Sequence, residues 1–379
     1  MTGKSMRNRQ KRGEICRENG QRNVLAAAAS GVADFIHRHG GDADRVLGLA
    51  GVPDHAIGDP LLALDLGDYC AMMELAAAET GHDNFGLWFG QQFQPRALGL
   101  IGEIALASPT LGAAVENLAS LFPFHQQATE TRLVREGGLL RLEYRILDGR
   151  IVERRQDAEL TMGMFANVFR TGLGSGWAPE EVHFEHLRPL DWRQHQQAFD
   201  APVHFGQRTN CVVFRDAHLD RRMPMGDLAR LTGLRDRLMA LAGSTGAAPF
   251  IERVRAEIRS RLADGYPHVE DVAEALGVAR WTLQRRLGDS GISFSEAVEG
   301  VRRDLAGLYV RQRHIPLSDV VGSAWPPSPG GRVNPASHRC RISARRRWWR
   351  RCWDWSRSCD RTTPGLCRTK SSADQGCPR

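Results

Sequence analysis

The sequence lacks any run of about 18 apolar residues, so no segment is long and apolar enough to cross a membrane as a helix. The apolar run at 24–29 is too short for a secretory signal peptide, and Asp34 follows soon after it. Cysteine is sparse in the first 320 residues, where Cys16, Cys70 and Cys211 are scattered without C-x-x-C spacing. We therefore expect a reduced, cytoplasmic protein with no cofactor and no metal site.

Signatures of enzymes are also missing. No Ser/His/Asp or Cys/His arrangement stands at motif spacing, and no paired carboxylates stand out. The stretch "TGLGSG" (171–176) does not fit G-x-G-x-x-G and is interpreted as a loop. His183 and His186 lie three apart in a predicted strand, so they point to opposite sides and cannot share an ion. We expect no catalytic residues, with an enzymatic or ligand-binding N-terminal region as the alternative.

The charge is uneven along the chain. The formal net charge is +7, but residues 1–23 hold seven Lys and Arg against two Glu, a net +5. Residues 321–379 hold thirteen Lys and Arg against three Asp, a net +10, which leaves −8 for residues 24–320. The overall basic charge therefore does not indicate nucleic-acid binding by the body of the protein, and any such binding requires a local basic surface.

Patterning divides the chain into five parts. Residues 1–23 are polar and aperiodic and are expected to form a disordered basic arm. Residues 24–240 mix helical and strand patterns, which predicts an α+β domain. A small-residue linker at 241–249 leads into 250–320, where apolar residues recur at helical spacing and predict an all-α domain. Residues 321–379 have no helical period and are expected to form a disordered tail.

Local signals predict several elements within the α+β part. Ser108-Pro109 is typical of a helix start. Glu136-Gly137-Gly138 separates two alternating stretches, which predicts a hairpin. The other predictions are helices at 24–41, 66–81 and 157–170 and strands at 180–186 and 211–214.

A helix, a tight turn and a second helix are predicted at 268–291. Gly277 ends the first helix as its left-handed residue, and the second runs from Arg280 to Leu287. This is the pattern of a helix-turn-helix. Ala279 departs from it, because a capping serine is expected there. The apolar positions of the pair are Val269, Val272, Ala273, Leu276, Leu283 and Leu287.

The second helix carries aromatic, amide and guanidinium side chains on its outer face. At 100° per residue, Trp281, Gln284 and Arg285 lie opposite the buried leucines. Arginine suits guanine, glutamine suits adenine, and tryptophan packs on sugar or a thymine methyl, so these residues suit base reading. The flanking residues that suit phosphate contacts are Arg280, Thr282 and Arg286. A small surface helix with a solvated charged face is the alternative interpretation.

A longer stretch makes the interpretation specific. Ser293 and Glu296 form a capping box ahead of a long amphipathic helix. The stretch from "DVAEALGVARWTLQRRL" to "YVRQRHIPLSDV" resembles the first half of the AraC/XylS-type DNA-binding domain. The stretches "FGLWFG", "LGLIGEIALASPTLGAAVENL" and "FEHLRP…APVHFGQ…N" resemble the N-terminal arabinose-binding effector domain of AraC-type regulators. Together these resemblances cover roughly 24–320.

The resemblance implies a transcription regulator that binds double-stranded DNA and responds to a small-molecule effector. It also implies a homodimer, with RNA polymerase as a candidate partner, and it places Arg280, Trp281, Gln284 and Arg285 at recognition-helix positions. The stretch "FPFHQQ" (122–127) is interpreted as core aromatics with a surface histidine, and as a wall of the effector pocket in the alternative.

The C-terminal stretch departs from the family pattern. Two helix-turn-helix units are expected, yet "PLSDVVGSAWPPSPGG" (316–331) begins like a helix and then turns to proline and glycine. The final 59 residues carry twelve Arg, five Trp and five Cys. We expect a frame slip or a rearrangement near residue 321 that removes the second unit and impairs specific DNA binding. The alternative is a genuine basic tail that binds nucleic acid without specificity.

Overall fold

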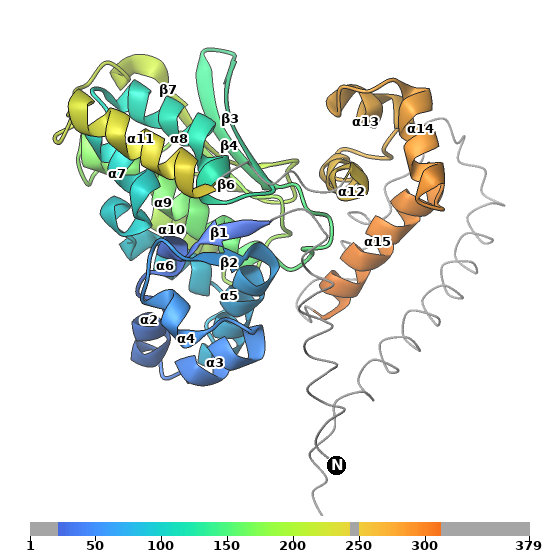
Figure 1. The fold of residues 1–379 in the computed structure, drawn as a ribbon, viewed down its shortest axis with the longest axis horizontal. Helices are drawn as coiled ribbons and strands as arrows, with labels where there is room; N and C mark the ends of the chain where they lie inside the picture. Colours follow the sequence, from blue (N-terminus) through green and yellow to red (C-terminus); the bar gives the residue numbers. More distant parts are fainter. Residues whose placement is uncertain (1–21, 243–249, 312–379) are drawn as a thin grey trace, which may run out of the picture. The chain divides into compact units, whose positions relative to one another are not determined.

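The computed structural model describes residues 22–242 and 250–311 (Figure 1). Helices and strands mix in the first part, and helices alone follow. The elements up to the hairpin are β1 (Asn23–Leu25), η1 (Ala26–Ala29), α2 (Val32–Arg38), α3 (Ala43–Ala50), α4 (Asp54–Ile57), β2 (Ala63–Asp65), α5 (Leu66–Thr80), α6 (Phe85–Gln92), η2 (Pro95–Leu98), α7 (Leu100–Ala107), α8 (Leu111–His125), β3 (Thr129–Glu136) and β4 (Leu139–Ile146).

The second half of the described chain continues this order. Its elements are α9 (Arg155–Leu173), β5 (Glu181–His183), α10 (Arg193–Phe199), β6 (Val203–His204), β7 (Asn210–Arg215), η3 (Asp216–His218), α11 (Leu228–Ala242), α12 (Phe250–Arg261), α13 (Val269–Ala275), α14 (Arg280–Asp289) and α15 (Phe294–Arg311). The mixed character predicted for the N-terminal part is confirmed, with helices after it.

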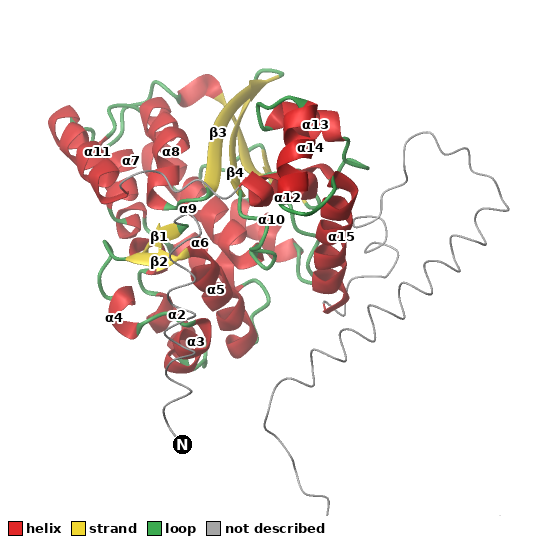
Figure 2. Cartoon of the chain, turned by 45° about the vertical axis from the view of Figure 1, so that its right-hand side comes forward, coloured by secondary structure: helices red, strands yellow, loops and turns green. Residues whose placement is uncertain are grey.

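A five-stranded sheet organises the N-terminal part in the order β3-β4-β7-β5-β6. Its pairs are antiparallel except for β5 with β6, which is parallel. Every second residue of β4 is buried, and the same face carries Val182 and Val212. α8 and α9 pack against this sheet, and Figure 2 shows α8 beside β3 and β4. The opposite face carries charged side chains, among them Arg141, Glu143 and Arg145.

The hairpin predicted around 136–138 is present. β3 and β4 pair from Thr129 with Ile146 to Glu136 with Leu139. Gly137 and Gly138 form the two-residue turn with φ of +59° and +81°. Positive φ at both positions matches the twist of the strands and favours glycine, so the glycine pair fixes the register of the hairpin.

The helix predicted at 157–170 is present as the longer α9, which packs closely against α6. A Cβ placed on Gly86 would lie 2.1 Å from the backbone oxygen of Gln156. A Cβ on Gly90 would lie 2.8 Å from the backbone oxygen of Leu160. The two helices therefore touch through their backbones, and the crossing requires residues without side chains.

Two helix starts differ from the prediction. The segment predicted as one helix at 24–41 contains β1, η1 and α2, because Gly31 adopts φ +82° and interrupts it. The helix predicted to open at Ser108-Pro109 begins at Leu111, with Thr110 as its cap. The Ser108 hydroxyl instead donates to the carbonyl of Ile104 at the end of α7, 2.8 Å away.

The predicted terminal segments lie almost wholly outside the described residues. Arg22 and Asn23, assigned to the disordered arm from sequence, belong to the fold instead. Arg22 pairs with Asp65 at 2.9 Å and Asp148 at 3.0 Å, and Asn23 lies in β1. The remainder of the arm, most of the linker and the whole of 321–379 are outside the described part, as is the stretch 316–331.

Candidate functional site

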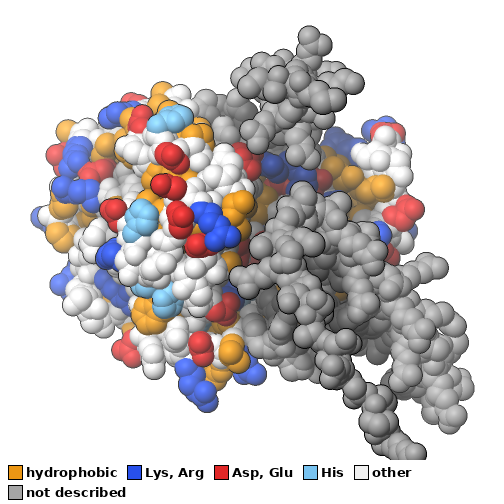
Figure 3. Space-filling model, turned by 90° about the horizontal axis from the view of Figure 1, so that it is seen from below, with side chains coloured by type: hydrophobic (Ala, Val, Ile, Leu, Met, Phe, Trp, Pro, Cys, Tyr) orange, Lys and Arg blue, Asp and Glu red, His pale blue; other side chains and the backbone are white. Residues whose placement is uncertain are grey.

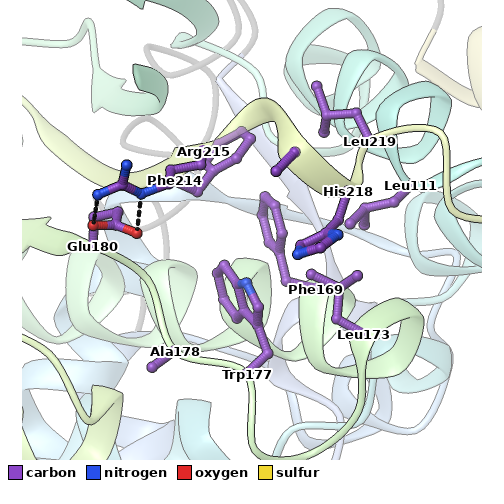
Figure 4. A pocket seen from close by; sticks show the side chains of 11 residues that line it. Leu111, Phe169, Leu173, Trp177, Ala178, Glu180, Phe214, Arg215, His218 and Leu219 are labelled. Atoms are coloured by element: carbon purple, nitrogen blue, oxygen red, sulfur yellow. Dashed lines mark hydrogen bonds and ion pairs between the residues drawn. The ribbon is translucent and has the colours of Figure 1, made fainter. Parts of the chain in front are cut away.

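An apolar pocket of about 210 Å³ lies where α9 ends (Figure 4). Phe169 stacks on Trp177 with ring centroids 4.5 Å apart and planes inclined by 8°, and Phe214 of β7 tilts against Phe169 at 4.6 Å. The pocket is lined by Leu111, Phe169, Leu173, Trp177, Ala178, Glu180, Phe214, Arg215, Ala217, His218 and Leu219. Apolar walls with few polar groups are typical of small-molecule sites.

An exposed ion pair lies at this pocket. The Arg215 guanidinium donates to both oxygens of Glu180, at 2.8 and 3.0 Å, and Figure 4 shows the two side chains beside the aromatic rings. This pairing lowers the pKa of Glu180 and raises that of Arg215. The pocket thus combines aromatic side chains, of which Trp177 is half-buried, with a guanidinium at its boundary that can exchange partners.

The pocket residues differ from those nominated from sequence. None of residues 122–127 lines this pocket. Phe122 is a core aromatic as expected, but His125 is 1% exposed rather than at the surface. Neither of its ring nitrogens has a hydrogen-bond partner, and burial lowers the pKa of His125 to about 4. The residue that sequence reasoning missed is Trp177. It follows the glycine-rich end of α9 and stacks on Phe169 in the pocket.

His183 and His186 are separated, but the strand predicted at 180–186 is shorter than expected: β5 ends at His183, so His186 lies outside it and the strand spacing is not the reason. His183 lies with Glu181 and His204, whereas His186 lies with Glu159 and His195. The stretch "TGLGSG" is only partly a loop, because Thr171 to Leu173 belong to α9 and Gly174 ends it.

α13 and α14 form the predicted pair of short helices. The amides of Gly277 and Val278 donate to the carbonyls of Glu274 and Ala273 at 2.9 and 3.0 Å, and Gly277 has φ +65°. These two bonds are the Schellman ending, which satisfies the last carbonyls of α13 and turns the chain into α14. Ala279 precedes α14 without a side-chain hydrogen bond, as its residue type predicts.

The outer face of α14 carries the residues nominated for base reading. Leu283 and Leu287 are fully buried, whereas Trp281 is 64% exposed, and Gln284 and Arg285 are exposed. The Arg285 guanidinium lies over the Trp281 ring, 5.3 Å from its centroid. The structure therefore brings these three side chains to one accessible face, and their role on DNA stays a prediction.

The nominated flanking residues have partners of their own. Arg280 pairs with Glu270 at 2.6 Å, and the Arg286 guanidinium lies 4.8 Å from the Phe250 ring centroid. Thr282 is half-buried. Phosphate contacts by Arg280 and Arg286 would therefore compete with these existing interactions.

α12 connects the helical part to the sheet. The Arg259 guanidinium donates to the carbonyl of Val152 at 3.0 Å, and the Ser260 hydroxyl donates to the carbonyl of Arg208 at 2.8 Å. Arg145 of β4 pairs with Glu257 at 2.7 Å. Burial lowers the pKa of Arg259 to about 10. Ionic and polar bonds thus connect α12 to the sheet and its neighbouring loops.

The described surface shows no dominant sign of charge on the face in Figure 3, where acidic and basic side chains are interspersed. In the same described part of the chain, no helix combines the length and apolar character needed to span a membrane.

Comparison with known proteins decides the family of the N-terminal part. Residues 40–223 match the model of the arabinose-binding domain of AraC transcription regulators, which is N-terminal in those proteins. These 184 residues, slightly under half of the chain, are similar to that domain family. The resemblance that the sequence suggested is therefore confirmed, and the pocket and the sheet lie largely within the arabinose-binding domain.

Similar proteins are transcription regulators. The ornithine utilization regulator of Pseudomonas aeruginosa is 23% identical over 301 residues, which cover 79% of this chain and 88% of that protein. The HTH-type transcriptional regulator VirS of Mycobacterium tuberculosis is 26% identical over 261 residues, covering 68% and 76%. The crystal structure of the transcriptional regulator CdpR from P. aeruginosa covers 83% of this chain and 95% of that chain, at 20% identity and a TM-score of 0.38.

Proposed function

We propose that this protein is an effector-responsive transcription regulator that reads double-stranded DNA with α14. The observation that carries the proposal is the exposed face of Trp281, Gln284 and Arg285 on a helix fixed by a Schellman turn. A helix face that only contacts water would not need a tryptophan, yet Trp281 is 64% exposed and lies under the Arg285 guanidinium. The arabinose-binding domain at 40–223 and the regulators similar to this chain support the same function.

The proposal includes impaired DNA binding. One recognition helix supplies half the base contacts of a reader that normally places two helices about 34 Å apart on the duplex. Residues 321–379 do not carry the sequence pattern of a second unit. Binding by this chain is therefore weak and governed by phosphate contacts, which makes it sensitive to salt. Resequencing codons 310–379 and translating all three frames tests whether a second unit lies in a neighbouring frame.

Arg285→Ala is the variant that tests base reading. At 50 mM salt we expect it to weaken binding to a duplex selected from a random pool by about 5- to 150-fold, the value of one good base contact. Arg303→Ala is the matched control, because Arg303 is an exposed arginine of α15 and its loss removes the same charge. Fluorescence-anisotropy titrations against 50–200 mM salt measure both.

Three outcomes of these titrations would be informative. Equal losses for Arg285→Ala and Arg303→Ala would contradict base reading by α14. Absence of DNA binding at the lowest salt would contradict the regulator function. A sequence-specific complex that persists at 200 mM salt would contradict the impairment.

The effector that the pocket suits is a small, planar, mostly apolar molecule. Trp177 is half-buried, rests on the buried Phe169 and supplies the stacking surface, and the cavity of about 210 Å³ admits one small ring system. We expect indole to raise the melting temperature of the wild type and not that of Trp177→Ala, which removes one stacking face. Indole-2-carboxylate is the matched anionic probe, and a larger shift with it would indicate that Arg215 leaves Glu180 for the ligand. No shift with either probe would contradict this ligand class.

A further inference from the structure

We propose that Glu181, His183 and His204 bind a divalent transition-metal ion, with Zn²⁺ as the probe, at the β5–β6 edge of the sheet. No metal site was expected here from the sequence, because His204 lies 21 positions beyond His183 and no ligand motif joins them. The structure brings them together through strand pairing. This site is distinct from the aromatic pocket and goes beyond the regulator function.

The backbone sets the ligand positions. Glu181 and His183 are two apart in β5, so they share a face, and His183 lies directly opposite His204 in the parallel pairing with β6. The Nε2 atom of His183 lies 2.8 Å from Oε2 of Glu181, and Nε2 of His204 lies 3.6 Å from the same oxygen. All three ligand atoms lie within 4.8 Å of one another.

These distances suit a tetrahedral ion. Ligand atoms about 2.0–2.2 Å from Zn²⁺ at tetrahedral angles lie roughly 3.3 Å from each other. The existing separations of 2.8 and 3.6 Å fall on either side of that value, so rotation of side chains is sufficient. Two imidazoles and one carboxylate are a donor set that zinc sites use, and the fourth position is left for water or another ligand.

Access and charge also favour this cluster. Glu181 and His204 have 41% and 49% of their side chains exposed, so an ion can enter from solvent. Arg141 is the basic group that acts on His183 from β4, and its own guanidinium lies 3.3 Å from Glu143. The carboxylate of Glu181 thus faces two imidazoles rather than a guanidinium, and its charge is available to a cation.

A second cluster provides the contrast. Glu159, His186 and His195 are also close together, but Glu159 and His195 are fully buried. Arg155 already pairs with Glu159 at 2.8 Å, so a divalent ion there would lie beside a buried guanidinium. Coulomb repulsion in a poorly solvated site opposes binding, and we therefore assign the ion to the β5–β6 edge.

The test uses the full chain in a background that removes competing thiols other than the buried Cys70 and Cys211. Serine replaces the other six cysteines, because thiolates bind zinc strongly: Cys16, Cys340, Cys352, Cys359, Cys367 and Cys377. Zn²⁺ affinity is measured by competition with a chromophoric chelator, and the melting temperature is followed with and without Zn²⁺. The variants are His204→Ala, Glu181→Gln and, as a control outside both clusters, His37→Ala, whose side chain is exposed.

We expect one equivalent of Zn²⁺ to bind and to raise the melting temperature of the background chain and of His37→Ala. His204→Ala and Glu181→Gln should each weaken binding at least tenfold, since even indirect changes around metal sites have effects of that size. Either of two results would overturn the proposal. One is unchanged affinity in His204→Ala, and the other is no binding at micromolar Zn²⁺ by the folded background chain.

Discussion

Arg154→Met is expected to lower the free energy of unfolding by about 3–5 kcal/mol at pH 7, because it removes one partner of a buried ion pair. Arg154 and Glu185 are 4% and 8% exposed, and the guanidinium binds both carboxylate oxygens at 2.6 and 2.8 Å. The methionine keeps an apolar chain of similar length, so the loss reports the charge together with its hydrogen bonds, which include one to the carbonyl of Ile146 at 2.9 Å. Urea unfolding followed by circular dichroism measures it.

The matched control is Arg215→Met, which breaks an ion pair of the same bidentate geometry at the surface. Arg215 and Glu180 have 66% and 40% of their side chains exposed, and water replaces the lost partner. We expect stability to remain almost unchanged there. Similar losses in the two variants would mean that burial does not set the cost of breaking the pair.

The same variant has a pH signature. In the wild type, Arg154 and Arg259 hold the pKa of Glu185 at about 2 despite its burial. The folded pKa lies below the unfolded value of about 4.3, so this stabilisation is present above pH 4.3 and is lost as the pH falls toward 2. Without Arg154, burial raises the pKa of Glu185. Protonation of Glu185 then removes the cost of burying an unpaired carboxylate. The difference in free energy of unfolding between wild type and variant should therefore become smaller as the pH falls from 7 to 4.5. A difference that stays constant over this range would contradict this account.

Gly86→Ala is expected to cost at least about 3 kcal/mol, because its methyl group would overlap the backbone of α9. The clashing atom is the carbonyl oxygen of Gln156, 2.1 Å from the added Cβ, and a backbone atom cannot turn aside as a side chain can. A shift of Gly86 away from α9 would also break a hydrogen bond, because its amide donates to the side-chain oxygen of Gln156 at 2.6 Å. Thermal unfolding followed by circular dichroism measures the loss, and failure to fold at 25 °C is its extreme form.

Gly48→Ala provides the control for glycine replacement in a helix. Gly48 is exposed within α3, and an added Cβ meets no atom within 4 Å. Alanine should stabilise this helix by about 0.5–1 kcal/mol, since it restricts the unfolded chain. If Gly86→Ala melted at the wild-type temperature, α6 and α9 would have to separate without cost, and the crossing would not be tight.

Local signals in the sequence predicted the elements that depend on local physics. Gly137-Gly138 set the hairpin, Gly81 ended α5, and Gly277 ended α13, because each supplies a positive φ that other residues avoid. The capping box of α15 is also present, with Ser293 and Glu296 exchanging hydrogen bonds at 2.7 and 3.2 Å. In each case neighbours in the chain are sufficient to determine the conformation.

Elements and sites that depend on distant contacts were missed. β6 has two residues, too few to show a strand period, yet pairing with β5 places His204 beside His183. The aromatic pocket collects residues from several segments between Leu111 and Leu219, and no spacing rule connects them. His125 was assigned to the surface, but the end of α8 carries it into the core.

β7 joins two regions that the sequence separates. One end of the strand carries Phe214 and Arg215 at the pocket, and just before its other end the carbonyl of Arg208 holds Ser260 of α12. Six residues of extended chain span about 20 Å and resist compression along their length. The strand therefore connects the pocket, at one end, to α12, the first helix of the helical part, at the other. The pocket and the contact with α12 are therefore anchored at opposite ends of one strand.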